Sequence, residues 1–315
     1  MDAHLRDLRY FVAVAEELSF TRAAEQLHIS QPAISKQIRG LETTLRARLL
    51  RRDRHSVELT AAGAALHAAA RGLLADWDEA AAVIASTSAA EAKVIRVGML
   101  TSIGRALYPA VLEYFDKHQP GWRVELRSVG WSDPTAGLAG QETDAAFLWL
   151  PIDQDDIAVE VLAAERRFVA VSDQHPLAGR AQVDFAEIAD EPFAALPVSA
   201  GAARDFWLAT GNRAGRPPRI AAEVTSADEV FEVVAAGPAL TLLAEGNATV
   251  YVRPGITCIP VTGLEPARLA VAWRHGDGRA CVANFVRACL DATVSLAPRA
   301  NPLGPSPMPI EVVPS

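Results

Sequence analysis

The feature that most constrains the fold is a run of three short amphipathic helices in the first 45 residues. Apolar side chains recur at helical spacing over residues 5–18 and predict one buried stripe. Ser19 and Ser30 are suitable N-caps for a second and a third helix, because a serine hydroxyl can accept a hydrogen bond from a free backbone N–H. Pro32 stands in the first turn of the third helix, where proline costs no hydrogen bond. A turn of three residues joins these two helices, and the pattern predicts a helix-turn-helix.

The second helix of such a motif presents its N-terminal residues to base edges in the major groove of DNA. Glutamine can bond adenine, serine can reach a base or a phosphate, and lysine can reach guanine or a phosphate. After this helix, residues 49–59 predict a small basic hairpin, a wing that can contact the neighbouring DNA backbone or minor groove. The predicted groove-facing positions are Gln31, Ala33, Ser35 and Lys36, with Arg39 one turn later.

The charge of the chain is unevenly distributed. The formal net charge of -8 at first argues against a nucleic-acid partner, because a phosphate backbone repels an acidic protein. Residues 31–55, however, carry seven Arg or Lys and only two Asp or Glu, a net of +5. This grouping is what a phosphate-binding face needs, and a solvated basic surface is the alternative.

The sequence from residue 8 to residue 63 resembles the DNA-binding region of LysR-type transcriptional regulators. SFTRAAEQL, the segment SQPAISKQI, the LE after it and the terminal LTAAG carry the resemblance. One departure is Arg46-Ala47, where the family usually has a glycine. The resemblance implies double-stranded DNA with an interrupted dyad operator as partner, and RNA polymerase is a further candidate. It implies base or backbone contacts by Gln31, Pro32, Ser35 and Lys36, and a wing that includes Arg52 and Arg54.

A long helix is predicted to begin after Thr60. Four apolar residues recur at spacings of seven, four and seven, a heptad-like seam typical of paired helices: Leu66, Leu73, Trp77 and Ile84. The alternative is a single amphipathic helix packed on its own domain. The family resemblance favours pairing, and therefore a dimer formed through residues 61–88 and a tetramer assembled from it. Residues 86–90 are expected to form a hinge.

The remaining chain to residue 297 alternates predicted strands and helices, which indicates an α/β sheet with mostly parallel strands. One helix is expected near residues 134–139. The order resembles the LysR-family effector domain, which is similar to periplasmic binding proteins; Pro238 stands where the family commonly has a second glycine. The predicted fold class is therefore α/β, with an N-terminal winged helix-turn-helix, a long linker helix and a two-lobed effector domain. The expected boundaries are 1–60, 61–90 and 91–297, with lobe I at 94–163 and 266–297 and lobe II at 164–265.

Ligands of such sheets bind at the carboxyl ends of strands, in the crevice between lobes. We expect Ser102 at a helix N-terminus, where free N–H groups favour an anion. Trp131 and Trp149 are expected to supply an aromatic wall, so the predicted effector is a small organic anion. The alternative is that the hydroxyls are ordinary caps and the tryptophans are core. The candidate effector-binding residues are Thr101, Ser102, Trp131, Trp149, Ser199 and Thr225.

Other classes of protein are disfavoured. The GxSxG, HExxH, GxGxxG and P-loop motifs are absent, so we predict no enzyme, no catalytic residue and no cofactor. Asp153, Asp155 and Asp156 are interpreted as a solvated turn rather than a metal site, and no metal is expected. A ligand-independent DNA-binding repressor or architectural protein is the remaining alternative, for which a large α/β domain with a crevice has no use.

Three cysteines without CxxC spacing fit a reducing cytoplasm, which is the expected localisation. Cys281 and Cys289 can share a helix face, as a redox pair or as inert core thiols. No apolar run approaches a membrane span, and the N-terminus does not resemble a signal peptide, so no membrane partner is expected. Residues 298–315 hold six prolines and predict a disordered tail.

Overall fold

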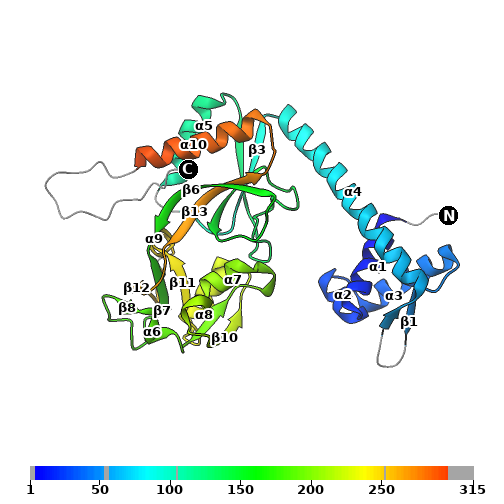
Figure 1. Ribbon diagram of the computed structural model, residues 1–315, viewed down its shortest axis with the longest axis horizontal. Helices are drawn as coiled ribbons and strands as arrows, with labels where there is room; N and C mark the ends of the chain where they lie inside the picture. The colour runs from blue at the N-terminus through cyan, green and yellow to red at the C-terminus, as the bar shows by residue number, and fades with distance from the viewer. Residues whose placement is uncertain (1–3, 53–56, 104–105, 252, 297–315) are drawn as a thin grey trace. The chain divides into compact units, whose positions relative to one another are not determined.

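The computed structural model describes residues 4–52, 57–103, 106–251 and 253–296 (Figure 1). The chain divides into two compact units, residues 1–87 and 88–315. The predicted Pro-rich tail, residues 298–315, lies outside the described residues.

The first unit contains the predicted helix-turn-helix. Helices α1 (Leu5–Glu17), α2 (Phe20–Gln26) and α3 (Gln31–Leu45) enclose a small apolar core. The Ser19 hydroxyl accepts a hydrogen bond from the backbone N–H of Arg22 at 3.3 Å, as an N-cap should. Ser30 occupies the N-cap of α3 but makes no side-chain cap bond. Strands β1 (Leu50–Arg52) and β2 (Val57–Leu59) pair antiparallel as the base of the predicted hairpin.

Arg46 ends α3 in the left-handed conformation, with φ of 52°. A side chain is strained there and glycine is not, so Arg46→Gly should stabilise the motif by about 0.5–1 kcal/mol despite the greater entropy of glycine in the unfolded chain. Slower amide hydrogen exchange at Ile38 and Leu41 of α3 in the full-length protein would show the gain. Arg46→Ala is the matched control, since it removes the same cation but keeps the Cβ atom. Equal exchange rates in the two variants would contradict the prediction.

A single long helix, α4 (Ala61–Glu91), follows the hairpin. The Thr60 hydroxyl accepts a hydrogen bond from the N–H of Gly63 at 2.9 Å and caps it. The segment expected to form a hinge, residues 86–90, is helical, because α4 continues to Glu91, and the division between the two compact units falls within it, after Thr87. Ser and Thr remain compatible with helix here; the Thr87 hydroxyl donates to the carbonyl of Val83 one turn earlier, at 2.9 Å.

The second unit is built on two main sheets. The larger has five strands in the order β4-β3-β5-β13-β6. Helices α5 and α10 pack together against it (Figure 1). Its strands are β3 (Val94–Met99), β4 (Arg123–Ser128), β5 (Ala145–Leu150), β6 (Ile157–Glu165) and β13 (Ala267–Arg274), and its helices are α5 (Leu107–His118) and α10 (Ala280–Leu296).

The second main sheet has the order β11-β7-β12-β8, and a two-stranded sheet β10-β9 lies in the same part of the chain. Short helices occupy the connections. The strands are β7 (Arg167–Ser172), β8 (Val183–Asp184), β9 (Pro192–Ala195), β10 (Arg219–Glu223), β11 (Thr241–Ala244) and β12 (Ile256–Thr262). The helices are α6 (Phe185–Ile188), α7 (Ala202–Trp207), α8 (Ala227–Ala235) and α9 (Glu245–Val250).

Two details of this unit differ from the prediction. The sheets are mixed rather than mostly parallel, since β13 runs antiparallel to β5 and β6, and β7 runs antiparallel to β11 and β12. The expected helix at residues 134–139 is a series of turns. There the Asp133 carboxylate accepts hydrogen bonds from the N–H groups of Thr135 at 2.9 Å and Gly137 at 2.8 Å. Gly137 has φ of 88°, a conformation that a helix does not contain.

A buried cluster of charged side chains joins β3 of the larger sheet to the residues just before β5 and α10. The Asp144 carboxylate is 1% exposed and accepts hydrogen bonds from Arg96 through its backbone N–H at 2.8 Å and its guanidinium at 3.0 and 3.1 Å. Arg279 donates to the same carboxylate at 3.0 Å. Burial alone would raise the pKa of Asp144, but the hydrogen bonds from Arg96 and the charges of Arg96 and Arg279 outweigh it and hold the pKa below its ordinary value.

Candidate functional sites

The first candidate site is the outer face of α3. Gln31, Pro32, Ala33, Lys36 and Arg39 are exposed and Ser35 is half-buried, whereas Ile34 and Ile38 are completely buried in the core of the unit. The amphipathic spacing of the helix thus anchors one face and leaves the predicted contact residues on the other. A row of amide, hydroxyl and cationic groups on an exposed helix is suited to contact base edges and phosphates.

Two further observations concern the end of α3 and the residues that follow it. Arg39, Arg46 and Arg48 line a shallow depression with Glu42, Thr43 and Ala47. The Glu42 carboxylate accepts hydrogen bonds from the N–H groups of Leu49 and Leu50, at 2.9 and 3.2 Å, and so ties the hairpin to the helix. Glu42 was assigned no role from the sequence, although this residue belongs to the LE pair that carries part of the family resemblance.

The wing can be assigned only in part. The backbone of Arg52 lies in β1, and its pairing with Val57 closes the ladder. Arg54 lies outside the described residues. The predicted contacts of these two arginines stay predictions.

The predicted seam on α4 carries large apolar side chains in contact with solvent. Leu73 is 55% exposed, Trp77 52% and Ile84 67%, while Leu66 packs against the core of the helix-turn-helix. Neighbouring polar contacts are the ion pair of Arg9 with Asp78, with N and O 2.5 Å apart, and the approach of the His67 Nε2 to the Glu16 carboxylate at 3.7 Å. Three large apolar residues along one exposed helix are unusual for a surface without a partner.

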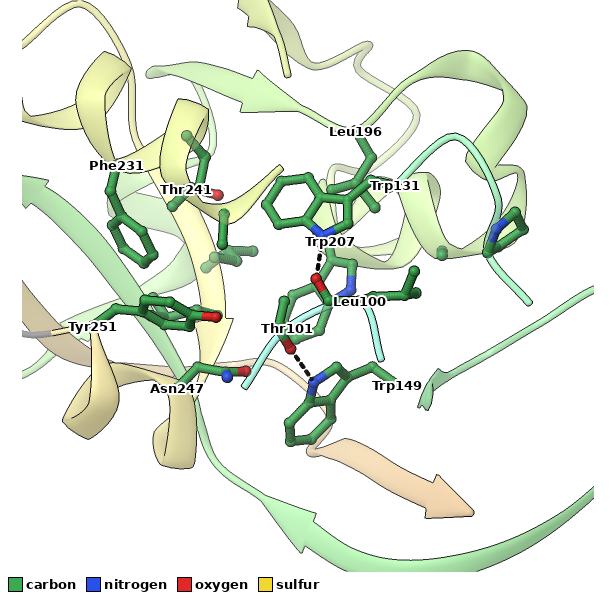
Figure 2. Close-up of a pocket in the computed structure, with 16 residues that line it drawn as sticks. Leu100, Thr101, Trp131, Trp149, Leu196, Trp207, Phe231, Thr241, Asn247 and Tyr251 are labelled. Atoms are coloured by element: carbon green, nitrogen blue, oxygen red, sulfur yellow. Dashed lines mark hydrogen bonds between the residues drawn. The ribbon is translucent and has the colours of Figure 1, made fainter. Parts of the chain in front are cut away.

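The second candidate site is a cavity in the second unit (Figure 2). The centre of a water molecule can occupy about 70 Å³ of this cavity, which is several times the volume that a single bound water requires. The structure brings together three of the predicted residues, Thr101, Trp131 and Trp149, in its wall. The Trp149 indole N–H donates to the Thr101 hydroxyl at 3.1 Å, and the Trp131 indole N–H donates to the Leu100 carbonyl at 2.9 Å (Figure 2).

We expected Ser102 to stand at a helix N-terminus. This expectation is wrong, because α5 begins only at Leu107. Its backbone N–H instead donates to the Tyr251 hydroxyl at 2.8 Å, and its carbonyl accepts from the Asn247 amide at 2.7 Å. Ser102 lines a second, more polar cavity. The residues around that cavity are Met99, Leu100, Thr101, Ser102, Ser128, Val129, Gly130, Ser226, Ala227, Asp228 and Tyr251.

The remaining two predicted residues, Ser199 and Thr225, line neither cavity. The Ser199 hydroxyl donates to the Ser132 carbonyl at 3.0 Å. The Thr225 hydroxyl donates to the Glu229 carboxylate at 2.8 Å, and the hydrogen bonds from Thr225 hold the pKa of Glu229 below its ordinary value. The Thr225 hydroxyl thus bonds locally at the start of α8, as the alternative of an ordinary cap describes, whereas the Ser199 hydroxyl links two segments of this unit.

Three of the five aromatic residues of the wall were not identified from the sequence. Trp207, Phe231 and Tyr251 line the cavity together with the polar residues Thr241 and Asn247. Three of these five lie in the segment from β11 to Tyr251, the residue after α9, which had no assignment from the sequence. Its signal was the apolar run before Glu245, which is typical of a buried strand.

Among the described residues, no group of three or more His, Cys, Asp or Glu has the arrangement of a metal site. The Asp153 carboxylate accepts a hydrogen bond from the N–H of Ala202 at 2.8 Å. Burial raises the pKa of the Cys258 thiol to about 11, and it also raises the pKa values of Cys281 and Cys289. Of the helices that the structure describes, none is long and apolar enough to cross a membrane.

Comparison with known families agrees with this architecture. Residues 5–64 match the family described as "Bacterial regulatory helix-turn-helix protein, lysR family", and residues 88–293 match "LysR substrate binding domain". A DNA-binding helix-turn-helix followed by a substrate-binding domain defines a transcriptional regulator. The chain belongs to the LysR family of these regulators, which confirms the resemblance and the fold class expected from the sequence.

Individual relatives span nearly the whole chain. The Hca operon transcriptional activator HcaR of Escherichia coli is 31% identical over 284 residues, covering 90% of this chain and 95% of its own. The regulator ShiR of Corynebacterium glutamicum is 31% identical over 283 residues, covering 87% and 94%. The crystal structure of full-length BenM is 27% identical, covers 93% of this chain and 97% of its own, and superposes with a TM-score of 0.50.

Proposed function

We propose that the exposed face of α3 and the wing recognise an interrupted dyad operator in double-stranded DNA. The observation that carries this is the row of exposed groups on α3, which lies within the most basic part of the chain. Gln31, Ser35 and Lys36 are assigned to base edges, and the other contacts to base edges or to the backbone. The remaining assigned residues are Pro32, Ala33, Arg39, Arg52 and Arg54.

The exposed apolar side chains of α4 support self-association. Leu73, Trp77 and Ile84 would be covered if two copies of α4 paired, which would also place two recognition helices on two half-sites. We assign residues 61–88 to this dimer and expect a tetramer built from it. The proposed domain boundaries stay at 1–60, 61–90 and 91–297.

The aromatic cavity supports regulation by a small-molecule effector, and favours it over a ligand-independent DNA-binding protein. The cavity is lined by residues from both main sheets and their connections, including Trp149 of β5 and Leu242 of β11. A ligand that binds one arrangement of the two sheets more tightly shifts the population toward that arrangement. We assign the protein a regulatory, non-catalytic role in the cytoplasm, where its three thiols would stay reduced.

A nuclease footprint of the full-length protein on the DNA beside its own gene tests the proposal. The expected result is protection of an interrupted dyad, with half-sites separated by whole helical turns. Trp77→Glu with Ile84→Glu should weaken that protection about 100-fold or more, because the paired helices would bury two carboxylates in each copy. The exchange Val250→Glu with Val294→Glu, at exposed apolar positions outside α4, is the matched control. A dyad footprint unchanged by the α4 variant would overturn the dimer assignment.

A further inference from the structure

The wall of the cavity is dominated by aromatic rings. Five of them surround it: Trp131, Trp149, Trp207, Phe231 and Tyr251 (Figure 2). Trp149 and Trp207 meet edge to face with centroids 6.2 Å apart, and Phe231 stacks on Tyr251 at 4.9 Å. Because these rings also contact one another, the shape of the cavity is largely pre-formed, and flat aromatic surface is what complements it.

Two polar groups in the wall are available to a ligand. The amide nitrogen of Asn247 donates to the Ser102 carbonyl, which orients the amide oxygen away from that bond. Neither this oxygen nor the Thr241 hydroxyl has a hydrogen-bond partner among the described residues, although Asn247 is 4% and Thr241 7% exposed. Neither atom is among the fully buried side-chain atoms that lack a partner, so each is open to the cavity, where a ligand N–H or O–H can donate to it.

Among the described residues, the wall carries no Lys, Arg, His, Asp or Glu. The nearby guanidinium of Arg167 lies 5.5 Å from the ring centroid of Trp207 and is not part of the wall; one of its nitrogens donates to the Phe206 carbonyl at 2.6 Å, and its buried Nε has no partner among the described residues. Arg204 is paired with Glu223 at 3.0 Å. A carboxylate in the cavity would lose its hydration without gaining a cation, and an ammonium would gain no carboxylate.

We propose that the effector is an uncharged aromatic molecule with at least one hydrogen-bond donor, which the Thr241 hydroxyl or the Asn247 amide oxygen accepts. This replaces the organic anion expected from the sequence, an expectation based on a helix N-terminus that the structure does not place at Ser102. The proposal rests on the proposed function, in that the cavity is the effector site.

Three ligands with one ring and one substituent test the charge directly: benzyl alcohol, benzoate and benzylamine, titrated into the full-length protein at neutral pH by calorimetry. Benzyl alcohol should bind at least about tenfold more tightly than either ion. Each ion would lose its hydration on entering the cavity without gaining an opposite charge from the wall. Tighter binding of benzoate or benzylamine, or no measurable preference for benzyl alcohol, would overturn the proposal.

Variants locate the binding. Thr241→Val keeps the shape of the side chain and removes its hydroxyl, so it should weaken the binding of benzyl alcohol about fivefold. Thr293→Val on α10 is the matched control and should leave the affinity unchanged. Arg105 lies outside the described residues, so Arg105→Gln is tested in parallel; benzoate binding that this variant removes would also overturn the proposal.

The two proposals fail in different ways. If benzoate binds and alters the operator footprint, the effector-regulated function stands and the uncharged ligand is wrong. If the full-length protein gives no specific footprint with or without any of the ligands, the proposed function itself is wrong, whatever the calorimetry shows.

Discussion

Replacing Ser35 and Lys36 together by alanine should reduce operator affinity about 100-fold or more and abolish the specific footprint. Each side chain that reaches a base edge contributes about 1–3 kcal/mol of discrimination, and two such losses combine to this effect. Lys36 is exposed and Ser35 half-buried on α3, outside the core formed by Ile34 and Ile38. The substitution therefore removes contacts without removing packing.

The measurement is a footprint and a salt titration of DNA binding with the full-length protein. Loss of the Lys36 charge from beside the phosphate backbone should lower the salt dependence by about one counterion. Ser295→Ala with Lys117→Ala is the matched control, since it makes the same chemical change in the other unit. An unchanged footprint from a folded Ser35/Lys36 variant would refute the assignment of α3 as the recognition helix.

Asp144→Ala should destabilise the second unit by about 3–5 kcal/mol. Removing one partner of a buried ion pair leaves the other charge buried and unpaired, and the side chain of Arg96 is only 9% exposed. Urea unfolding of the full-length protein, followed by tryptophan fluorescence, measures the loss. Asp228→Ala is the control, because its ion pair with Arg253 is at the surface and should contribute little.

The same cluster predicts a pH dependence. Hydrogen bonds and charges from Arg96 and Arg279 leave the pKa of Asp144 lower in the folded chain than in the unfolded one. Its contribution is therefore complete above the ordinary carboxylate pKa and is lost as the pH falls through the lower folded value. The stability difference between the wild type and Asp144→Ala should shrink on acidification; a difference that grows would contradict this account.

The helix-turn-helix could be predicted nearly residue by residue because its determinants are local. Apolar spacing places Phe11 and Ile34 in the core, and the Ser19 cap and the left-handed turn at Arg46 depend on neighbours within a few residues. The long helix was also predictable, but its end was not. Ser and Thr weaken a helix only slightly, so the run at residues 86–90 did not decide where α4 stops.

The cavity could be predicted only in part because it is assembled from distant segments. Trp131 and Trp149 follow or end strands that were recognised, whereas Tyr251 reaches Ser102 across 149 positions of sequence. The same holds for sheet direction. Antiparallel pairing of β13 with β5 depends on where the chain returns after crossing the second sheet, and local pattern contains no information on that return.

The buried cysteines have a practical and a chemical consequence. With the Cys258 pKa near 11, about one thiol in ten thousand is ionised at pH 7, and Cys289 is completely buried. Thiolate, not thiol, attacks peroxides, disulfides and maleimides, so oxidants and alkylating labels would react very slowly with this chain. An extra cysteine introduced at an exposed position can thus carry a fluorophore selectively, without first removing the native ones, and test whether an added ligand changes the arrangement of the two sheets.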